Sequence, residues 1–224
     1  MDGKLIVIEG LDGSGKSTQE ELLKKRLSDS GVKVNFIKLP NYDDPACELV
    51  KMYLAGRFGN KPDDVNAYAA SAFFAVDRYV SYNCYWKEKY LNNEIFLADR
   101  YTTSNAYHQL TKTDRTEWDS YLEWLEDFEY NKMGIPKPDA VIYLDMPIEV
   151  SQKLMTGRYN GDESKKDIHE KNVEYLNNCR LAADYACEKL GWIRINCSKD
   201  GNPLPIETIS ADIFDAVTRA IGIK

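Results

Sequence analysis

The sequence contains no hydrophobic run long enough to cross a membrane. Near its start the longest unbroken apolar stretch covers residues 5–8, whereas a membrane-spanning helix needs roughly 20 apolar residues and a secretory signal roughly 7 or more. The five cysteines form an odd set without a C-x-x-C pair, which argues against a disulfide framework or a zinc site. We therefore expect a soluble, cytoplasmic protein whose cysteines are reduced.

The sequence also lacks an excess of positive charge. It has 36 Asp and Glu against 29 Lys and Arg, a net charge of -7, and so offers no general attraction to nucleic acid polymers or anionic membranes. Internal repeats, low-complexity tracts and Pro/Gly-rich linkers are missing as well. With 224 residues, of which 43% are hydrophobic, the chain is predicted to form a single domain over residues 1–224 with a substantial core.

Short apolar runs alternate with longer helical patterns along the chain. Strands are predicted at residues 4–9, 32–39, 94–98, 140–145 and 192–197, and helices at residues 17–30, 48–54, 63–90, 116–128 and from 205 onward. The acidic pair Asp63 and Asp64 suits the N-terminus of the long helix. Because the strands are almost continuously apolar and are separated by helices, we expect an α/β fold of three layers. Its central parallel sheet of about five strands would carry helices on both faces.

The first predicted strand leads directly into a glycine-rich phosphate loop. Residues 10–17, GLDGSGKS, match the pattern G-x-x-x-x-G-K-[ST] and lie between a strand and a helix, as a P-loop NTPase fold requires. The glycines let backbone N–H groups turn toward an anion at the helix N-terminus. Lys16 is expected to reach the β and γ phosphates, and the Ser17 hydroxyl to bind Mg²⁺. The predicted polyphosphate site comprises Gly10, Asp12, Gly13, Ser14, Gly15, Lys16, Ser17 and Thr18.

A phosphate loop alone does not distinguish kinases from GTPases, ATPases and molecular switches. GTPases recognise their base with an N-K-x-D motif. The nearest string in this sequence, NKMG at residues 131–134, lacks the aspartate and does not follow an apolar strand. The sequence therefore disfavours a GTPase.

Residues beyond the phosphate loop predict a second anion and a base. Asp99 and Arg100 follow the apolar run IFLA, where the carboxylate can orient Mg²⁺ and the guanidinium can bind a second phosphate. Phe74 and Arg78 lie one turn apart on the long helix, so an aromatic ring can stack on a base while the guanidinium reaches a base carbonyl. Asp12, inside the loop, can accept a hydrogen bond from a sugar hydroxyl.

Several motifs together resemble one known family. They are GLDGSGKST at the phosphate loop, LPNYDDP after the second strand, FFAVDR on the long helix, DRYTTSNAYHQ after the third strand, PDAVIYLDMP at the fourth and the basic stretch GRYNGDESKKDIHE. In this combination, which covers nearly the whole chain, the sequence resembles the thymidylate kinases, which transfer the γ-phosphate of ATP to dTMP. The resemblance implies a dTMP kinase that uses ATP and Mg²⁺.

The resemblance also implies which residues hold the acceptor's phosphate and sugar. Arg100 is expected to bind the dTMP phosphate, and Tyr42 to approach it. Asp12 is expected to meet the 3′-hydroxyl. A bulky side chain at the sugar 2′ position would exclude ribonucleotides, and either Tyr107 or His108 is implied to occupy that place.

The thymine base is implied to lie against the long helix and the segment after the third strand. Phe74 would stack on the base and Arg78 would reach its carbonyl edge. Ser104 and Asn105 would lie along the base and the sugar. The implied substrate-binding residues are Asp12, Tyr42, Phe74, Arg78, Arg100, Ser104, Asn105 and His108.

The family's mobile lid is implied at about residues 156–170, and it would supply a cation for the transition state. Its candidates are Arg158, Lys165 and Lys166, of which Arg158 is preferred. Asp99 is implied to help Ser17 hold Mg²⁺. The predicted catalytic residues are Lys16, Asp99, Arg100 and Arg158.

Two further expectations concern the donor base and a partner subunit. Adenine is expected to contact the loop at residues 198–205. A homodimer is expected, as in the family, through the aromatic residues of the long helix, Tyr68, Phe73, Tyr79, Tyr82 and Tyr85.

Two alternatives stay open. The first is a kinase of another deoxynucleotide or of a deoxynucleoside. The second is a nucleotide-binding regulatory module without transfer activity, which the complete set of Lys16, Ser17, Asp99 and Arg100 disfavours.

Overall fold

A five-stranded parallel sheet forms the centre of the computed structural model, which describes residues 3–158 and 173–223. All neighbouring strands of this sheet pair in parallel. In spatial order the strands are β2 (Asn35–Lys38), β3 (Ile95–Asp99), β1 (Lys4–Glu9), β4 (Ala140–Asp145) and β5 (Ile193–Asn196). The predicted parallel sheet is therefore confirmed, and β2 is shorter than the run predicted at residues 32–39.

Successive residues of β1 point to opposite faces of the sheet and pack into two different hydrophobic clusters. Leu5 and Val7 belong to one cluster, and Ile6 and Ile8 to the other. Because all four side chains are buried, both faces need a helical cover, as the uninterrupted apolar run predicted. The chain thus has the three-layer architecture of a P-loop NTPase fold.

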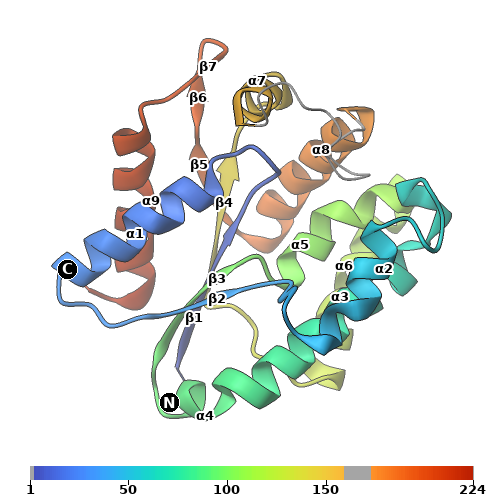
Figure 1. The fold of residues 1–224 in the computed structure, drawn as a ribbon, viewed down its shortest axis with the longest axis horizontal. Helices are drawn as coiled ribbons and strands as arrows, with labels where there is room; N and C mark the ends of the chain where they lie inside the picture. The colour runs from blue at the N-terminus through green and yellow to red at the C-terminus, as the bar shows by residue number, and fades with distance from the viewer. Residues whose placement is uncertain (1–2, 159–172, 224) are drawn as a thin grey trace.

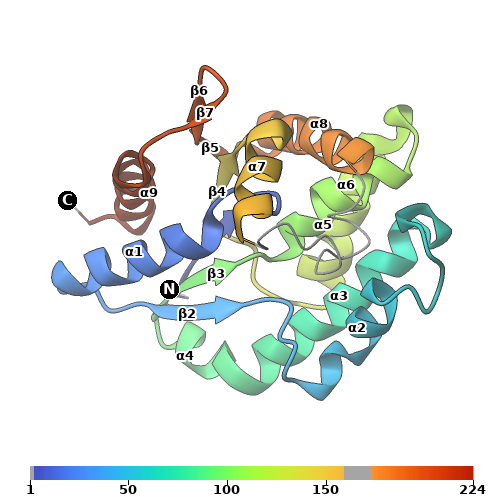
Figure 2. The ribbon, with the colours of Figure 1, turned by 45° about the horizontal axis from the view of Figure 1, so that its top comes forward.

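The helices lie on the two faces as Figures 1 and 2 show. One face packs against α1 (Lys16–Asp29) and α9 (Ile206–Ile221). The other face packs against a larger group, α3 (Ala67–Ser81), α4 (Lys87–Leu91), α5 (Thr102–His108), α6 (Trp118–Glu126) and α8 (Val173–Leu190).

The remaining elements extend from this core. α2 (Glu48–Leu54) packs on α3, and α7 (Ile148–Arg158) follows β4. A small antiparallel hairpin, β6 (Ser198–Lys199) and β7 (Asn202–Pro203), precedes α9. Among the helices that the structure describes, none has the length and apolar character that a membrane crossing demands.

The prediction of one long helix over residues 63–90 is wrong about the residue at which the helix begins and about its continuity. A 3₁₀ turn covers Pro62–Asp64, and α3 begins only at Ala67, because the Asn66 side chain caps it by accepting a hydrogen bond from the Ala69 N–H at 2.8 Å. A π-helical segment at Tyr82–Trp86 then separates α3 from α4. Neither feature leaves a signal in the spacing of the apolar residues.

All five cysteines lie in the described part of the chain and are free thiols there. Four of them are buried, and Cys84 alone is exposed. Burial raises the pKa of Cys47, Cys179 and Cys197 to about 12, so these three thiols are not ionised at neutral pH.

Candidate active site

The carboxyl ends of the parallel strands bring the predicted chemistry to one edge of the sheet. β1 ends at the phosphate loop, β2 at Lys38 and β3 at Asp99, with Arg100 directly after it. These residues line a cavity of about 840 Å³. A cleft at this edge is where open α/β sheets bind their ligands.

The phosphate loop adopts a backbone that requires glycine. Gly13 has φ +79° and Gly15 has φ +89°, both in the left-handed region. A Cβ on Gly13 would also lie 2.8 Å from the Ser151 carbonyl oxygen and 2.9 Å from Met155 Cγ. The loop is therefore held close against α7, and its N–H groups sit at the N-terminus of α1.

Lys16 lies over the loop that carries it. Its Nζ donates hydrogen bonds to the Gly10 oxygen at 2.6 Å and to the Leu11 oxygen at 3.3 Å. Burial, followed by the nearby charge of Arg100, lowers the pKa of Lys16 to about 8. An anion in the cavity would offset both effects and favour the charged ammonium group.

Asp99 offers an oxygen that suits a cation. One carboxylate oxygen, Oδ2, pairs with Lys38 Nζ at 3.4 Å, whereas the buried Oδ1 has no hydrogen-bond partner. The exposed Ser17 lies in the same cavity. Carboxylate and hydroxyl oxygens fit Mg²⁺, and the described residues hold no cluster of metal-binding side chains, so phosphate oxygens and water would complete its shell.

Arg100 joins the phosphate loop to the segment after β3. Its backbone is left-handed, with φ 68°, and its N–H donates to the Ile8 oxygen at 3.1 Å. The guanidinium donates to Asp12 Oδ1 at 2.6 Å and to the Tyr107 hydroxyl at 3.2 Å. The side chain is thus fixed between the two regions that were predicted to hold two different phosphates.

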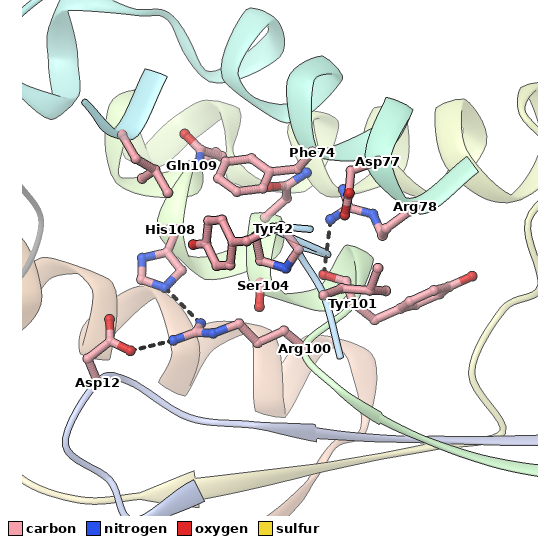
Figure 3. A pocket seen from close by; sticks show the side chains of 14 residues that line it. Asp12, Tyr42, Phe74, Asp77, Arg78, Arg100, Tyr101, Ser104, His108 and Gln109 are labelled. Carbon is pink, nitrogen blue, oxygen red and sulfur yellow. Dashed lines mark hydrogen bonds and ion pairs between the residues drawn. The ribbon is translucent and has the colours of Figure 1, made fainter. Parts of the chain in front are cut away.

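A second cavity, of about 150 Å³, adjoins the first. All the residues predicted to bind the acceptor line this second cavity, which is therefore called the acceptor cavity. All of them except Asn105 are labelled in Figure 3. Asp12, Tyr42 and Arg100 line the larger cavity too, and so stand where the two cavities meet. The tertiary structure therefore brings together predicted residues from four separate segments of the chain.

The two neighbouring phenylalanines of α3 are in different surroundings. Both rings lie near Tyr53, at 6.2 Å for Phe73 and 6.1 Å for Phe74 between ring centroids. Phe74 also lines the acceptor cavity, whereas Phe73 does not and packs on Phe58 at 5.3 Å. This placement supports the expectation that Phe74, and not its neighbour, stacks on the base.

Arg78 does not form a surface charge pair with its sequence neighbour Asp77. Both are buried, and the carboxylate of Asp77 accepts a hydrogen bond from the Asn41 N–H at 3.2 Å. Arg78 instead forms a buried, bidentate ion pair with Glu129, with both distances 2.6 Å. The ion pair with Glu129 therefore fixes the Arg78 side chain at the wall of the acceptor cavity.

Of the two candidates for the sugar 2′ position, only His108 lines the acceptor cavity. Its Nε2 lies 3.4 Å from Arg100 NH1. Tyr107 is fully buried and donates its hydroxyl to Glu9 at 2.8 Å.

Most of the predicted lid lies outside the described residues. Arg158 is the last residue of α7, but its side chain and residues 159–170, which include Lys165 and Lys166, are not described. Their roles stay predictions. In the loop expected to contact adenine, Pro203 and Leu204 line the larger cavity.

Several residues of the site were not found from the sequence. Glu9 is fully buried and accepts hydrogen bonds from the Tyr101 N–H and from the hydroxyls of Thr103, Ser104 and Tyr107. A carboxylate at the end of an apolar strand was a visible signal for it. Lys38 at the end of β2 had a similar signal, whereas Glu129, in an acidic stretch, had none.

Comparison with known proteins agrees with this geometry. The family model for thymidylate kinase matches residues 8–205. The chain belongs to the thymidylate kinase family. Family membership confirms the resemblance noted in the motifs, and it implies ATP as the phosphate donor and small-molecule substrates.

Individual relatives cover nearly the same extent. A protein of Saccharolobus solfataricus named probable thymidylate kinase 1 is 30% identical over 215 residues, which are 94% of this chain and 99% of the relative. Thymidylate kinase of Mycobacterium tuberculosis is 28% identical over 191 residues, 84% of this chain and 87% of the relative. A solved structure of thymidylate kinase from Candida albicans has a TM-score of 0.69 at 19% identity, covers 97% of this chain and 92% of its own, and shares the fold.

Proposed function

We propose that the protein is a dTMP kinase, which transfers the γ-phosphate of ATP to dTMP and releases ADP and dTDP. One observation carries the proposal. Arg100 lines both the cavity that contains Lys16 and the cavity that contains Phe74, so it stands between a polyphosphate site and a base-sized site. Two phosphates held on either side of it would face one another, as phosphoryl transfer requires.

The chain's own residues would work by alignment and charge neutralisation. Lys16 would hold the β and γ phosphates of ATP, and Arg100 the phosphate of dTMP. Asp12, which pairs with Arg100 at 2.6 Å, would orient that guanidinium and accept a hydrogen bond from the sugar hydroxyl. Lys38, on the same cavity, adds a cation close to Asp99. Little covalent chemistry is left for a protein group, because the acceptor phosphate is already an anion.

We further propose that Ser17 and Asp99 hold Mg²⁺. The unpartnered, buried Oδ1 of Asp99 supports this assignment. When bound, Mg²⁺ would neutralise charge on the β and γ phosphates of ATP. Removing divalent cations with a chelator should abolish transfer, and added Mg²⁺ should restore it.

A panel of acceptors with ATP and Mg²⁺ tests the proposed function. We expect dTDP from dTMP and no product from thymidine. Phosphorylation of thymidine but not of dTMP would establish a deoxynucleoside kinase instead. ATP binding without product from any monophosphate would establish a regulatory module.

We also propose a cytoplasmic homodimer that uses α3, as the family resemblance implies. Tyr68, Tyr79 and Tyr85 are exposed on this helical region and can contribute to a contact, whereas Tyr82 is buried and Phe73 packs on its neighbours. Light scattering on Tyr79→Glu, which introduces a charge into this surface, would test the dimer.

A further inference from the structure

A buried carboxylate lies behind the acceptor cavity without lining it. Glu129 belongs to the π-helical segment Asp127–Lys132 and is fully buried. It accepts hydrogen bonds from Arg78 Nε and NH2, both at 2.6 Å, from the Thr102 hydroxyl at 2.7 Å and from Asn105 Nδ2 at 3.4 Å. An ionised carboxylate only accepts hydrogen bonds, so it dictates which atoms of its neighbours turn toward it.

The orientation of the Asn105 side chain follows from its partners. Its Nδ2 donates to Glu129 Oε1 at 3.4 Å and to the Ser71 carbonyl oxygen at 3.3 Å. Neither partner can donate, so the amide nitrogen must face them. Among hydrogen bonds between described residues, Oδ1 of Asn105 takes part in none, and Asn105 lines the acceptor cavity. The amide therefore presents an acceptor to a ligand.

Arg78 is constrained in the opposite sense. Glu129 occupies its Nε and NH2 atoms. The remaining nitrogen, NH1, donates only a long hydrogen bond, 3.4 Å, to the Tyr101 carbonyl oxygen (Figure 3). Because a guanidinium has no acceptor, Arg78 presents a donor to the cavity that it lines.

We infer that Glu129 is a positioning residue that fixes Arg78 as a donor and Asn105 as an acceptor, and so selects a pyrimidine with a carbonyl next to a ring N–H. The inference rests on the proposed function and adds to it the buried residue that sets the orientation of the groups facing the base. Thymine and uracil carry this pair as O4 and N3–H. Cytosine carries the reverse pair, an amino group beside an unprotonated ring nitrogen, and would leave both protein groups unpaired.

The test compares dTMP with dCMP as acceptors for the wild-type protein and for Glu129→Gln. A glutamine at this position has one donor and one acceptor, so the amide of Asn105 can turn round. We expect the ratio of kcat/KM for dTMP to that for dCMP to fall by at least about tenfold, mainly through a higher KM for dTMP. The matched control is Glu126→Gln, which loses an ion pair to Lys137 away from the acceptor cavity and should leave the ratio unchanged.

A purely structural role of Glu129 would lower both activities in parallel and leave the ratio intact, and that result would overturn the inference. The double variant Glu129→Gln with Asn105→Asp moves the carboxylate to the side chain that contacts residue 129, and it has only oxygens at position 105. It should recover the wild-type ratio even where the single variant fails to fold, and a relaxed ratio in it would also contradict the inference. Wild-type turnover of dTMP tests the proposed function separately.

Discussion

Arg100 donates a hydrogen bond to Asp12 at 2.6 Å although the two residues are 88 positions apart in the sequence. The contact ties the phosphate loop after β1 to the segment after β3, and both residues line both cavities. The loop that would hold the donor and the cation that would hold the acceptor are thus parts of one rigid arrangement.

Removing the positive side chain of either Lys16 or Arg100 should strongly reduce phosphoryl transfer. Lys16→Ala and Arg100→Ala should each raise the barrier by on the order of 3 kcal/mol, a loss of over about a hundredfold in kcat/KM. A coupled assay for ADP with dTMP as the acceptor measures this. Lys25→Ala, which removes an exposed lysine of α1, is the control and should be near wild type. Near-normal turnover by either site variant would contradict the assignment.

The glycines of the loop should differ in their tolerance of a methyl group. Gly15→Ala meets no atom within 4 Å and is strained only by its φ of +89°, at a cost of about 1–2 kcal/mol. Gly13→Ala has the same kind of backbone strain, and its Cβ would in addition lie 2.8 Å from the Ser151 carbonyl oxygen. It should therefore lower the free energy of unfolding further than Gly15→Ala. Denaturant melts of the two variants give the comparison, and equal losses would argue against the close packing of the loop on α7.

Selection against ribonucleotides should depend on His108 and not on Tyr107. His108→Ala opens the cavity wall and should improve UMP relative to dUMP as an acceptor by about tenfold. Tyr107→Phe loses a buried hydrogen bond to Glu9 of 2.8 Å and should cost about 1 kcal/mol of stability with an unchanged UMP to dUMP ratio. The reverse outcome would place Tyr107 at the sugar.

Substitutions of the two neighbouring phenylalanines of α3 should affect different quantities, the KM for dTMP in one case and the stability of the fold in the other. Phe74→Ala removes an aromatic wall of the acceptor cavity and should raise the KM for dTMP by about tenfold or more. Phe73→Ala leaves that wall in place but breaks the packing on Phe58, so it should mainly lower the melting temperature. A larger rise in KM for the Phe73 variant would exchange the two assignments.

Lys112 should give the fold a distinctive pH dependence. Burial lowers its pKa to about 8 from the usual 10.5 of a lysine, and its Nζ donates to the Tyr53 hydroxyl and the Val65 oxygen. A lysine with a lower pKa in the folded than in the unfolded chain destabilises the fold while it is charged. That penalty is present below pH 8 and disappears as the pH rises toward 10.5.

The measurement for Lys112 is the free energy of unfolding of the wild type and of Lys112→Met across this range. The wild type should gain on the order of 2 kcal/mol relative to the variant between about pH 7.5 and about pH 10. Parallel curves for the two proteins would show that Lys112 keeps its ordinary pKa in the folded chain.

The sequence predicted the sheet and the donor half of the site because both depend on local patterns. An apolar strand of β-branched residues followed by GLDGSGKS has few structural alternatives, and β1 and β4 begin and end where they were predicted. The run DRY after β3 was informative for the same reason, since it follows a buried strand. The break of the long helix was not predictable, because an Asn66 cap and a π-helical segment do not alter the apolar spacing.

The acceptor half was decided by contacts between distant segments. Local sequence placed Phe74 and Arg78 on one helical face, but only the folded chain shows that Arg78 pairs with Glu129 and that His108, not Tyr107, reaches the cavity. The sequence by itself determined which residues lie at the carboxyl ends of the strands, because the ends of a strand and the side chains that follow it depend on neighbouring residues in the sequence. The tertiary structure alone decided which donors and acceptors face the acceptor cavity, because a buried carboxylate 51 residues from Arg78 sets their direction.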